Sequence, residues 1–265
     1  MSKFQGVADT LFIPLTARIY ASKRFPEYFY DETALSLEKE IPGDGIEKGS
    51  NEYTMLASVA RYYNMDAMIN EFARKNGKCN VVNLGAGFET ASRRIKNPDI
   101  TFYLVDLPHV AKARERVLGA AENEILIGAD IFNSGWAEKI QGNLPILFVV
   151  SGVFQYFHEE DILKLISGLK EKFPGSEMIF DATNKAGIRY ADRYVKKTGN
   201  TSAKMYFSVE DPKEFAQKSG TVLLGYRHFY TDARKILKGK VNFYSRIAMR
   251  IVDGRNMAFI LHIRL

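Results

Sequence analysis

The sequence predicts an α/β protein whose core is a parallel, doubly wound sheet, and three observations support this prediction. Short apolar runs alternate with helical segments between residues 79 and 185, an arrangement typical of parallel sheets. The run from Pro145 to Val150 is apolar throughout, as expected of a strand that is buried on both faces. Apolar residues make up 46% of the chain and charged residues 26%, the usual mixture of a globular domain.

We expect a single domain over residues 1–265 with three parts: a helical cap at 1–75, a core at 76–185, and a lid with C-terminal strands at 186–265. In the cap, a long helix is predicted to follow Ser50 and to end at Gly77, because its apolar residues recur at helical spacing. The core strands are predicted at 80–84, 100–105, 125–127, 145–150 and 177–180, with helices at 108–121 and 159–173.

The C-terminal third has a different pattern. Residues 186–210 are polar and predict an irregular lid, and Asp211 to Lys218 predict a short helix. Two strand-like runs follow, from Tyr244 to Val252 and from Met257 to Leu265, and the turn residues Asp253-Gly254-Arg255-Asn256 join them. This combination predicts a hairpin, with an antiparallel strand closing one edge of the sheet.

Composition argues against several classes of function. The chain has one cysteine, Cys79, and no Cys/His cluster with zinc-ligand spacing, so we expect no metal site and a reducing, cytoplasmic location. The apolar runs are too short to span a membrane. The net charge of +6 comes from scattered residues, so nucleic acid and membrane are not expected as partners.

A strand, a glycine bend and an acidic residue form the most informative pattern. The strand ending at Leu84 runs into Gly85-Ala86-Gly87, and Asp106 ends the next strand 21 positions after Gly85. Glycines let backbone approach a ligand closely, and a carboxylate at that place can accept hydrogen bonds from ribose hydroxyls. Thr90 occupies the third glycine position of a dinucleotide fingerprint, which favours adenosylmethionine over a dinucleotide; an ordinary strand-to-helix turn is the third interpretation.

A second aspartate follows the third predicted strand. Asp130 lies in Gly128-Ala129-Asp130-Ile131, where its side chain can accept a hydrogen bond from an adenine amine while Ile131 packs on the ring. A helix N-cap or a turn aspartate is the alternative interpretation.

These segments together resemble the leucine carboxyl methyltransferase superfamily, and within it the bacterial polyketide-type O-methyltransferases. The resemblance rests on Val82 to Thr90, on Arg94 and on Val105-Asp106-Leu107-Pro108. It extends over about residues 8 to 185. The supporting segments are Leu15 to Arg18, Phe29 to Ala34, Gly128 to Asp130, Ser151 to Phe157 and Ile179 to Asp181.

The resemblance implies S-adenosylmethionine as cofactor and a Rossmann-like, seven-stranded class I methyltransferase sheet with an N-terminal helical cap. It implies that Arg61 pairs with the cofactor carboxylate, since a guanidinium suits this bidentate contact, and that Arg18 faces the same end. The other implied cofactor contacts are Gly85, Gly87, Asp106, Leu107, Asp130, Ile131 and Ser151. The family usually has Glu-Gly after the fourth strand, and Ser151-Gly152 stands there in this chain.

The expected reaction is methyl transfer to an oxygen atom of a small molecule. A carboxylate acceptor is already ionised at neutral pH, whereas a phenol usually needs a base. His158 is the best base candidate among His109, His158, His228 and His262, but no catalytic residue is assigned, which favours a carboxylate over a hydroxyl. Acceptor contacts are predicted at Tyr20, Phe154, Tyr156 and Tyr190. The alternatives are a carboxyl methyltransferase acting on a protein, a nicotinamide-dependent oxidoreductase and a non-catalytic nucleotide-binding protein.

Overall fold

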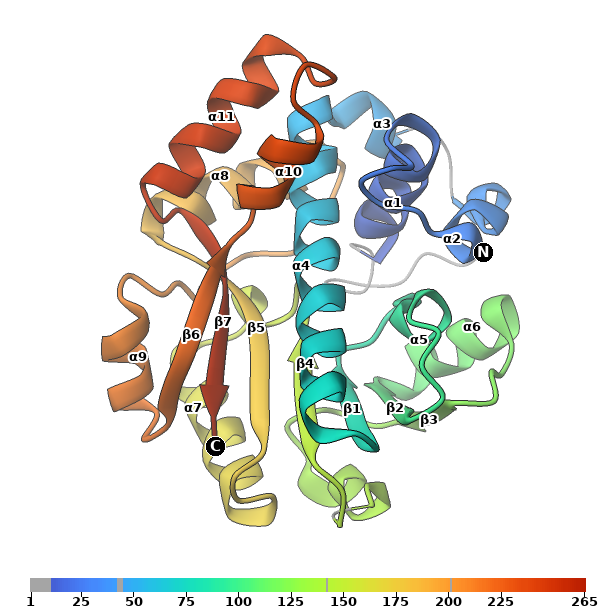
Figure 1. The fold of residues 1–265 in the computed structure, drawn as a ribbon, viewed down its shortest axis with the longest axis vertical. Helices are drawn as coiled ribbons and strands as arrows, with labels where there is room; N and C mark the ends of the chain where they lie inside the picture. Colours follow the sequence, from blue (N-terminus) through green and yellow to red (C-terminus); the bar gives the residue numbers. More distant parts are fainter. Residues whose placement is uncertain (1–10, 42–44, 142, 201) are drawn as a thin grey trace.

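A seven-stranded sheet runs through the molecule, and helices cover both of its faces and one end of its strands (Figure 1). The computed structural model describes residues 11–41, 45–141, 143–200 and 202–265. The strand order is β3-β2-β1-β4-β5-β7-β6, with β1 to β5 parallel and β7 antiparallel to both neighbours. The strands are β1 Cys79–Leu84, β2 Ile100–Asp106, β3 Glu124–Gly128, β4 Ile146–Val150, β5 Glu177–Thr183, β6 Val222–His228 and β7 Ala258–Arg264.

The first four helices form the predicted N-terminal cap: α1 Phe12–Arg24, α2 Glu32–Ser36, α3 Gly45–Gly49 and α4 Glu52–Asn76. The helices that follow are α5 Ala91–Arg94, α6 Pro108–Leu118, α7 Glu159–Lys172, α8 Lys185–Lys197, α9 Pro212–Lys218, α10 Thr231–Ile236 and α11 Phe243–Gly254. No described helix is both long and apolar enough to cross a membrane.

The long helix α4 has local signals at both ends. Asn51 and Thr54 form a capping box: the Asn51 side chain accepts from the Thr54 N–H at 2.9 Å, and the Thr54 hydroxyl accepts from the Asn51 N–H at 2.9 Å. Such boxes satisfy amide groups that a helix start leaves unpaired. Gly77 ends the helix with a φ of 69°, a conformation that glycine adopts without strain. The predicted helix after Ser50 is confirmed.

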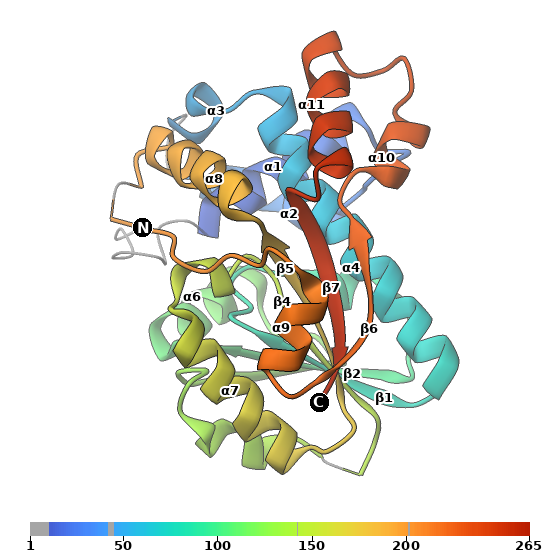
Figure 2. The same cartoon turned by 90° about the vertical axis from the view of Figure 1, so that its left-hand side faces the viewer.

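Alternate residues of the central strands pack against different helices. Val81 belongs to the apolar cluster that contains the buried face of α4, and its neighbour Val82 belongs to the cluster that contains Ile162 and Ile166 of α7. Figure 2 shows α4 and α7 on opposite sides of the sheet. Both faces are therefore covered, as the unbroken apolar runs predicted.

The structure corrects the prediction for the C-terminal third. Residues 244–252 lie in helix α11 and do not form a strand, so the predicted hairpin at 253–256 is wrong. The partner of β7 is instead β6, which the sequence pattern missed, and β7 lies between β5 and β6 inside the sheet. The start of the predicted irregular lid is also a helix, α8, whereas the predicted short helix is confirmed as α9.

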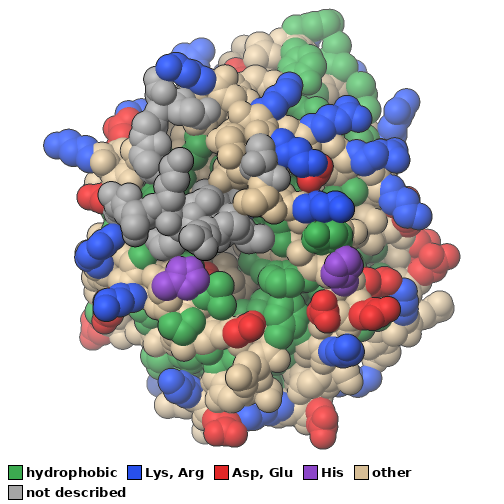
Figure 3. Space-filling model, turned by 180° about the vertical axis from the view of Figure 1, so that it is seen from behind, with side chains coloured by type: hydrophobic (Ala, Val, Ile, Leu, Met, Phe, Trp, Pro, Cys, Tyr) green, Lys and Arg blue, Asp and Glu red, His purple; other side chains and the backbone are tan. Residues whose placement is uncertain are grey.

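Charged side chains of both signs are visible on one face of the molecule (Figure 3). On the face seen in Figure 3, Lys and Arg side chains are spread around the molecule with Asp and Glu side chains among them. This distribution agrees with the scattered charge of the sequence.

Candidate active site

The carboxyl ends of the central strands border a cavity of about 660 Å³, the usual place for a ligand in an open α/β sheet. The structure brings all nine predicted cofactor residues to its wall: Arg18, Arg61, Gly85, Gly87, Asp106, Leu107, Asp130, Ile131 and Ser151. Two predicted acceptor residues, Tyr156 and Tyr190, also line it.

The other two predicted acceptor residues do not line the cavity. Phe154 is 1% exposed and packs in the core against Phe180, with ring centroids 5.1 Å apart. Tyr20, on α1, packs against Phe25 at 6.1 Å. The short 3₁₀ turn at Phe154–Tyr156 sends the first aromatic side chain into the core and the last to the cavity, which sequence spacing alone does not reveal.

The glycine bend and the acidic strand end meet at the cavity as predicted. Gly85 and Gly87 have φ angles of 71° and 49°, a region that favours glycine. The Asp106 carboxylate accepts from the Gly87 N–H at 2.6 Å and from the Leu107 N–H at 2.7 Å. Burial raises the pKa of Asp106, while these two donors oppose the rise. Each oxygen keeps a free lone pair, so Asp106 can still accept two ligand hydroxyls.

Asp130 and Ile131 lie after β3, beside this bend. The Asp130 carboxylate accepts from the Phe132 N–H at 3.0 Å and is otherwise exposed at the cavity wall. Ile131 is buried. One carboxylate oxygen therefore shapes the turn, and the other side of the group faces the cavity beside an apolar surface.

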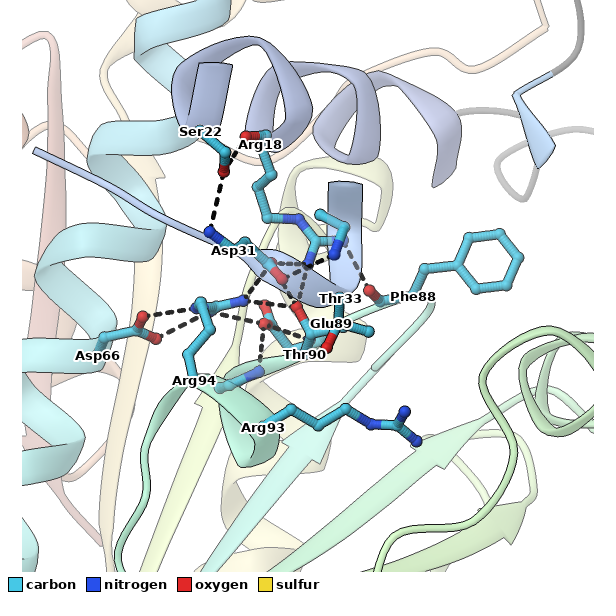
Figure 4. A network of polar contacts seen from close by, with 12 residues as sticks. Arg18, Ser22, Asp31, Thr33, Asp66, Phe88, Glu89, Thr90, Arg93 and Arg94 are labelled. Carbon is cyan, nitrogen blue, oxygen red and sulfur yellow. Dashed lines mark hydrogen bonds and ion pairs between the residues drawn. The ribbon is translucent and has the colours of Figure 1, made fainter. Parts of the chain in front are cut away.

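Arg18 lies in a buried network that joins the cap to the glycine bend (Figure 4). It is 1% exposed and pairs with Asp31 at 2.9 Å. It also donates to the Thr90 hydroxyl and, at 2.6 Å, to the Phe88 carbonyl. These contacts show that the guanidinium holds the loop after Gly87 in place, and its Nε lacks a partner among the described residues.

Arg94 completes the network from the other side. It makes a bidentate pair with Asp66 at 2.8 and 2.9 Å and contacts Asp31 at 3.0 Å and Glu89 at 2.9 Å. Glu89 also accepts the N–H groups of Thr90 and Ala91. Buried charges are tolerated only when they are paired, and these pairs join the loop at Glu89 and Thr90 to the helical cap.

Arg61 lies over the ends of β4 and β5. Its Nη1 contacts the Asp181 carboxylate at 3.2 Å, and the other oxygen of that carboxylate accepts from the Gly152 N–H at 2.6 Å. Burial alone would lower the pKa of Arg61, but the Asp181 carboxylate and the Tyr62 hydroxyl together outweigh this effect and raise the pKa. Asp181 was part of the resemblance without an assigned role, and the pattern gave no sign of this pairing.

Several buried polar atoms on the cavity wall lack a hydrogen-bond partner among the described residues. They are Ser151 Oγ, Gln155 Oε1, Arg61 Nε and Arg18 Nε. A buried polar atom without a partner is costly, so their gathering around one cavity is typical of a site for a polar ligand.

Tyrosines from distant parts of the chain line another part of the cavity. Tyr53 is at their centre, and its ring lies 5.8 Å from Tyr190, 5.8 Å from Tyr230 and 6.2 Å from Tyr244. Burial raises the pKa of Tyr190, and the Tyr244 hydroxyl raises it further. The sequence predicted only Tyr190, because the others stand on α4, before α10 and on α11.

No histidine of the described residues lines the cavity. His158, the predicted base candidate, is exposed and its ring lies 4.3 Å from that of Tyr206. Within the same described ranges, no three His, Cys, Asp or Glu side chains are placed to hold a metal ion.

Known proteins are similar to this chain in sequence and in fold. The chain is 24% identical over 217 residues to the tetracenomycin polyketide synthesis O-methyltransferase TcmP of Streptomyces glaucescens, covering 82% of this chain and 80% of the relative. A DUF574 family protein from Streptomyces avermitilis has a similar fold, with a TM-score of 0.62 and 15% identity over 94% of this chain and 96% of that one.

A third similar protein is an S-adenosylmethionine dependent methyltransferase from Mesorhizobium loti. Its TM-score is 0.54 at 19% identity, over 79% of this chain and 100% of that one. These two structures confirm the predicted Rossmann-like class I methyltransferase fold with its seven-stranded sheet.

The family model described as leucine carboxyl methyltransferase matches residues 13–170, more than half of the chain. The match covers nearly all of α1, the helices α2 to α4, and the segments that supply the glycine bend, Asp106 and Asp130. It confirms the resemblance, and with it the expected class of enzyme, a methyltransferase that uses S-adenosylmethionine. This chain belongs to the leucine carboxyl methyltransferase family.

Proposed function

We propose that the protein methylates an oxygen atom, most favourably a carboxylate, of a small apolar molecule. The observation that supports this proposal is the division of the cavity. Charged side chains lie at the carboxyl ends of β2, β3 and β5, together with Arg61 of α4, and uncharged tyrosines line the part that α8 and α11 cover. The first part suits a charged nucleoside cofactor, and the second suits an apolar acceptor.

The residues at the charged part fit S-adenosylmethionine. Asp106 would accept both ribose hydroxyls, and Asp130 would accept from the adenine amine while Ile131 packs on the ring; all three residues line the cavity. Arg61 would bind the carboxylate of the methionine part, and its Nε, which has no partner among the described residues, adds a donor. When bound, this cofactor supplies a methyl group already activated on sulfur; the chain itself orients the two reactants and excludes water.

The tyrosine part favours an acceptor that needs no base. Tyrosine hydroxyls are protonated at neutral pH, and burial raises the pKa values of Tyr53, Tyr190 and Tyr230 further, so these hydroxyls act as neutral contacts. A carboxylate is ionised at that pH without help, whereas a phenol is not. The relative TcmP, whose name describes an O-methyltransferase of polyketide synthesis, supports an oxygen acceptor.

A methyl-transfer assay with matched acceptors tests the proposal. Labelled S-adenosylmethionine is incubated with the protein and either a naphthoic acid or the corresponding naphthol. We expect label in the acid, as a methyl ester that mild alkali hydrolyses to methanol. Label only in the naphthol, as an alkali-stable ether, would contradict a carboxylate acceptor.

Cofactor binding is measured separately. Adenosylhomocysteine should raise the melting temperature of the protein, because a ligand that binds only the folded state stabilises it, and NAD should not. The opposite pattern would favour the oxidoreductase alternative, and stabilisation without transfer to any acceptor would favour a non-catalytic binding protein.

A further inference from the structure

One acidic residue of the cavity lies apart from the glycine bend, at the carboxyl end of β5. Asp181, on β5, is 9% exposed and lines the cavity beside Ser151 and Arg61. One of its oxygens is held by the Gly152 N–H at 2.6 Å, and the other contacts Arg61 Nη1 at 3.2 Å. The backbone contact fixes the orientation of the carboxylate, so its second oxygen is presented to this end of the cavity.

Gly152 makes this arrangement possible. Its φ is 71°, and a Cβ at this position would lie 2.8 Å from Arg61 Nη1 and 2.9 Å from Nη2. A side chain there would displace the guanidinium. The glycine therefore allows Arg61 and Asp181 to share one small region at the ends of β4 and β5.

The methionine part of the cofactor has two charged groups attached to its α-carbon, a carboxylate and an ammonium group. Arg61 complements the carboxylate, and the ammonium group needs an anionic acceptor close by. The other carboxylates of the described cavity wall are committed elsewhere. Glu89 pairs with Arg94 and caps α5, whereas Asp106 and Asp130 shape the bends after β2 and β3.

We propose that Asp181 binds the ammonium group of the cofactor while Arg61 binds its carboxylate, and that Ser151 Oγ accepts a further hydrogen bond from the ammonium group. The inference rests on the proposed function. In the free protein the two side chains neutralise each other, and the zwitterion offers each of them an opposite charge in exchange. Ser151 Oγ is buried without a partner among the described residues, so this bond would satisfy it.

The proposal also accounts for Ser151 at a position where the family usually has glutamate. The negative charge is present in this cavity, but it comes from the neighbouring strand β5. β4 and β5 are paired side by side, with Val150 opposite Phe180. A carboxylate at the end of either strand therefore lies in the same region.

Ligands that lack one charge test the pairing directly. Isothermal titration compares adenosylhomocysteine with its analogue without the amino group and its analogue without the carboxylate. In Asp181→Asn, the affinity for adenosylhomocysteine should fall about 10- to 100-fold, the usual effect of losing a charged hydrogen bond. The affinity of the same variant for the analogue without the amino group should fall less than about threefold.

Arg61→Gln should show the reverse pattern. Its affinity should fall for adenosylhomocysteine and change little for the analogue without the carboxylate. Asp181→Asn is nearly isosteric, and its amide oxygen can still accept from the Gly152 N–H, so the loop is expected to keep its conformation. Asp99→Asn makes the same change at an exposed position outside the cavity and should leave all three affinities unaltered.

Two outcomes would overturn this inference and leave the proposed function intact. If Asp181→Asn weakens adenosylhomocysteine and the analogue without the amino group equally, the residue has only a structural role. If it weakens neither, the ammonium group has another partner. Failure of the unaltered protein to bind adenosylhomocysteine would instead overturn the proposed function, and this inference with it.

Discussion

At the scale of single residues, Asp106 has two tasks. It holds the Gly87 and Leu107 N–H groups, which fixes the bend, and it faces the cavity. Burial raises its pKa, because water solvates the charge of a buried carboxylate poorly. Ligand hydroxyls that donate to this carboxylate would therefore supply hydrogen bonds that the free protein lacks.

We expect Asp106→Ala to abolish the rise in melting temperature with adenosylhomocysteine, because both ribose contacts and the fixed bend are lost. Differential scanning fluorimetry with and without ligand measures this effect. Asp99→Ala is the control, since that exposed carboxylate lies outside the cavity. An unchanged ligand shift in Asp106→Ala would rule out the ribose contact.

At the scale of secondary structure elements, the position of α8 sets the shape of the acceptor part of the cavity. The Asn184 side chain caps this helix by accepting from the Gly187 N–H at 2.9 Å. Gly187 lies so close to the start of β7 that a Cβ there would be 2.3 Å from the Met257 carbonyl oxygen. The glycine thus allows α8 to place Tyr190 against Tyr53.

Gly187→Ala should lower the free energy of unfolding by about 1–3 kcal/mol, the usual cost of overpacking a close contact. Urea denaturation measures the change. Gly168→Ala is the matched control: this glycine is in helix α7 and has open space where an added methyl group would lie, so alanine should stabilise the protein by about 0.5–1 kcal/mol. Equal stabilities of the two variants would contradict the close approach of α8 and β7.

At the scale of the whole molecule, ion pairs join elements that are far apart in the sequence. Glu177 on β5 contacts His262 of β7 at 2.7 Å and Lys75 of α4 at 3.1 Å. The hydrogen bond from His262 lowers the pKa of Glu177 below its ordinary value of 4.5, burial opposes this, and Lys75 adds to the lowering. This contact therefore stabilises the fold only while Glu177 is ionised.

A lowered pKa in the folded state gives stability that is present above pH 4.5 and is lost as the pH falls through the folded-state pKa. We therefore expect the wild-type protein to have a higher urea midpoint than Glu177→Gln at about pH 5.5, with the difference shrinking towards about pH 3. Glu122→Gln, at an exposed carboxyl, should show no such trend. A difference between wild type and Glu177→Gln that is constant with pH would contradict the role of the ionised carboxyl.

Much of the fold and the part of the cavity around the glycine bend could be predicted from the sequence, because the signals there are local. Each strand from β1 to β5 is a short apolar run bounded by glycine, proline or helix-starting residues. Gly85, Gly87 and Asp106 stand at strand ends, and the carboxyl ends of parallel strands meet at one edge of a sheet. Their common cavity thus follows from the order of elements along the chain.

The C-terminal third could not be predicted in this way. Ile247, Ile251 and Val252 favour a strand by their side chains, but they lie in helix α11, which buries Met249 and Val252 against the core. The edge strand β6 is only partly buried, so it lacks a clear apolar alternation. Pairing with β7 determines its conformation.

The tyrosine wall and the Asp181–Arg61 pair depend entirely on tertiary contacts. Asp181 and Arg61 are 120 positions apart, and Tyr53 and Tyr244 come from the distant helices α4 and α11. Neither spacing nor composition encodes such proximity. The local sequence specifies a glycine bend with an acid beside it, since both features arise within neighbouring strand ends, whereas the partners of the charged and aromatic side chains arise only when the sheet places distant elements side by side.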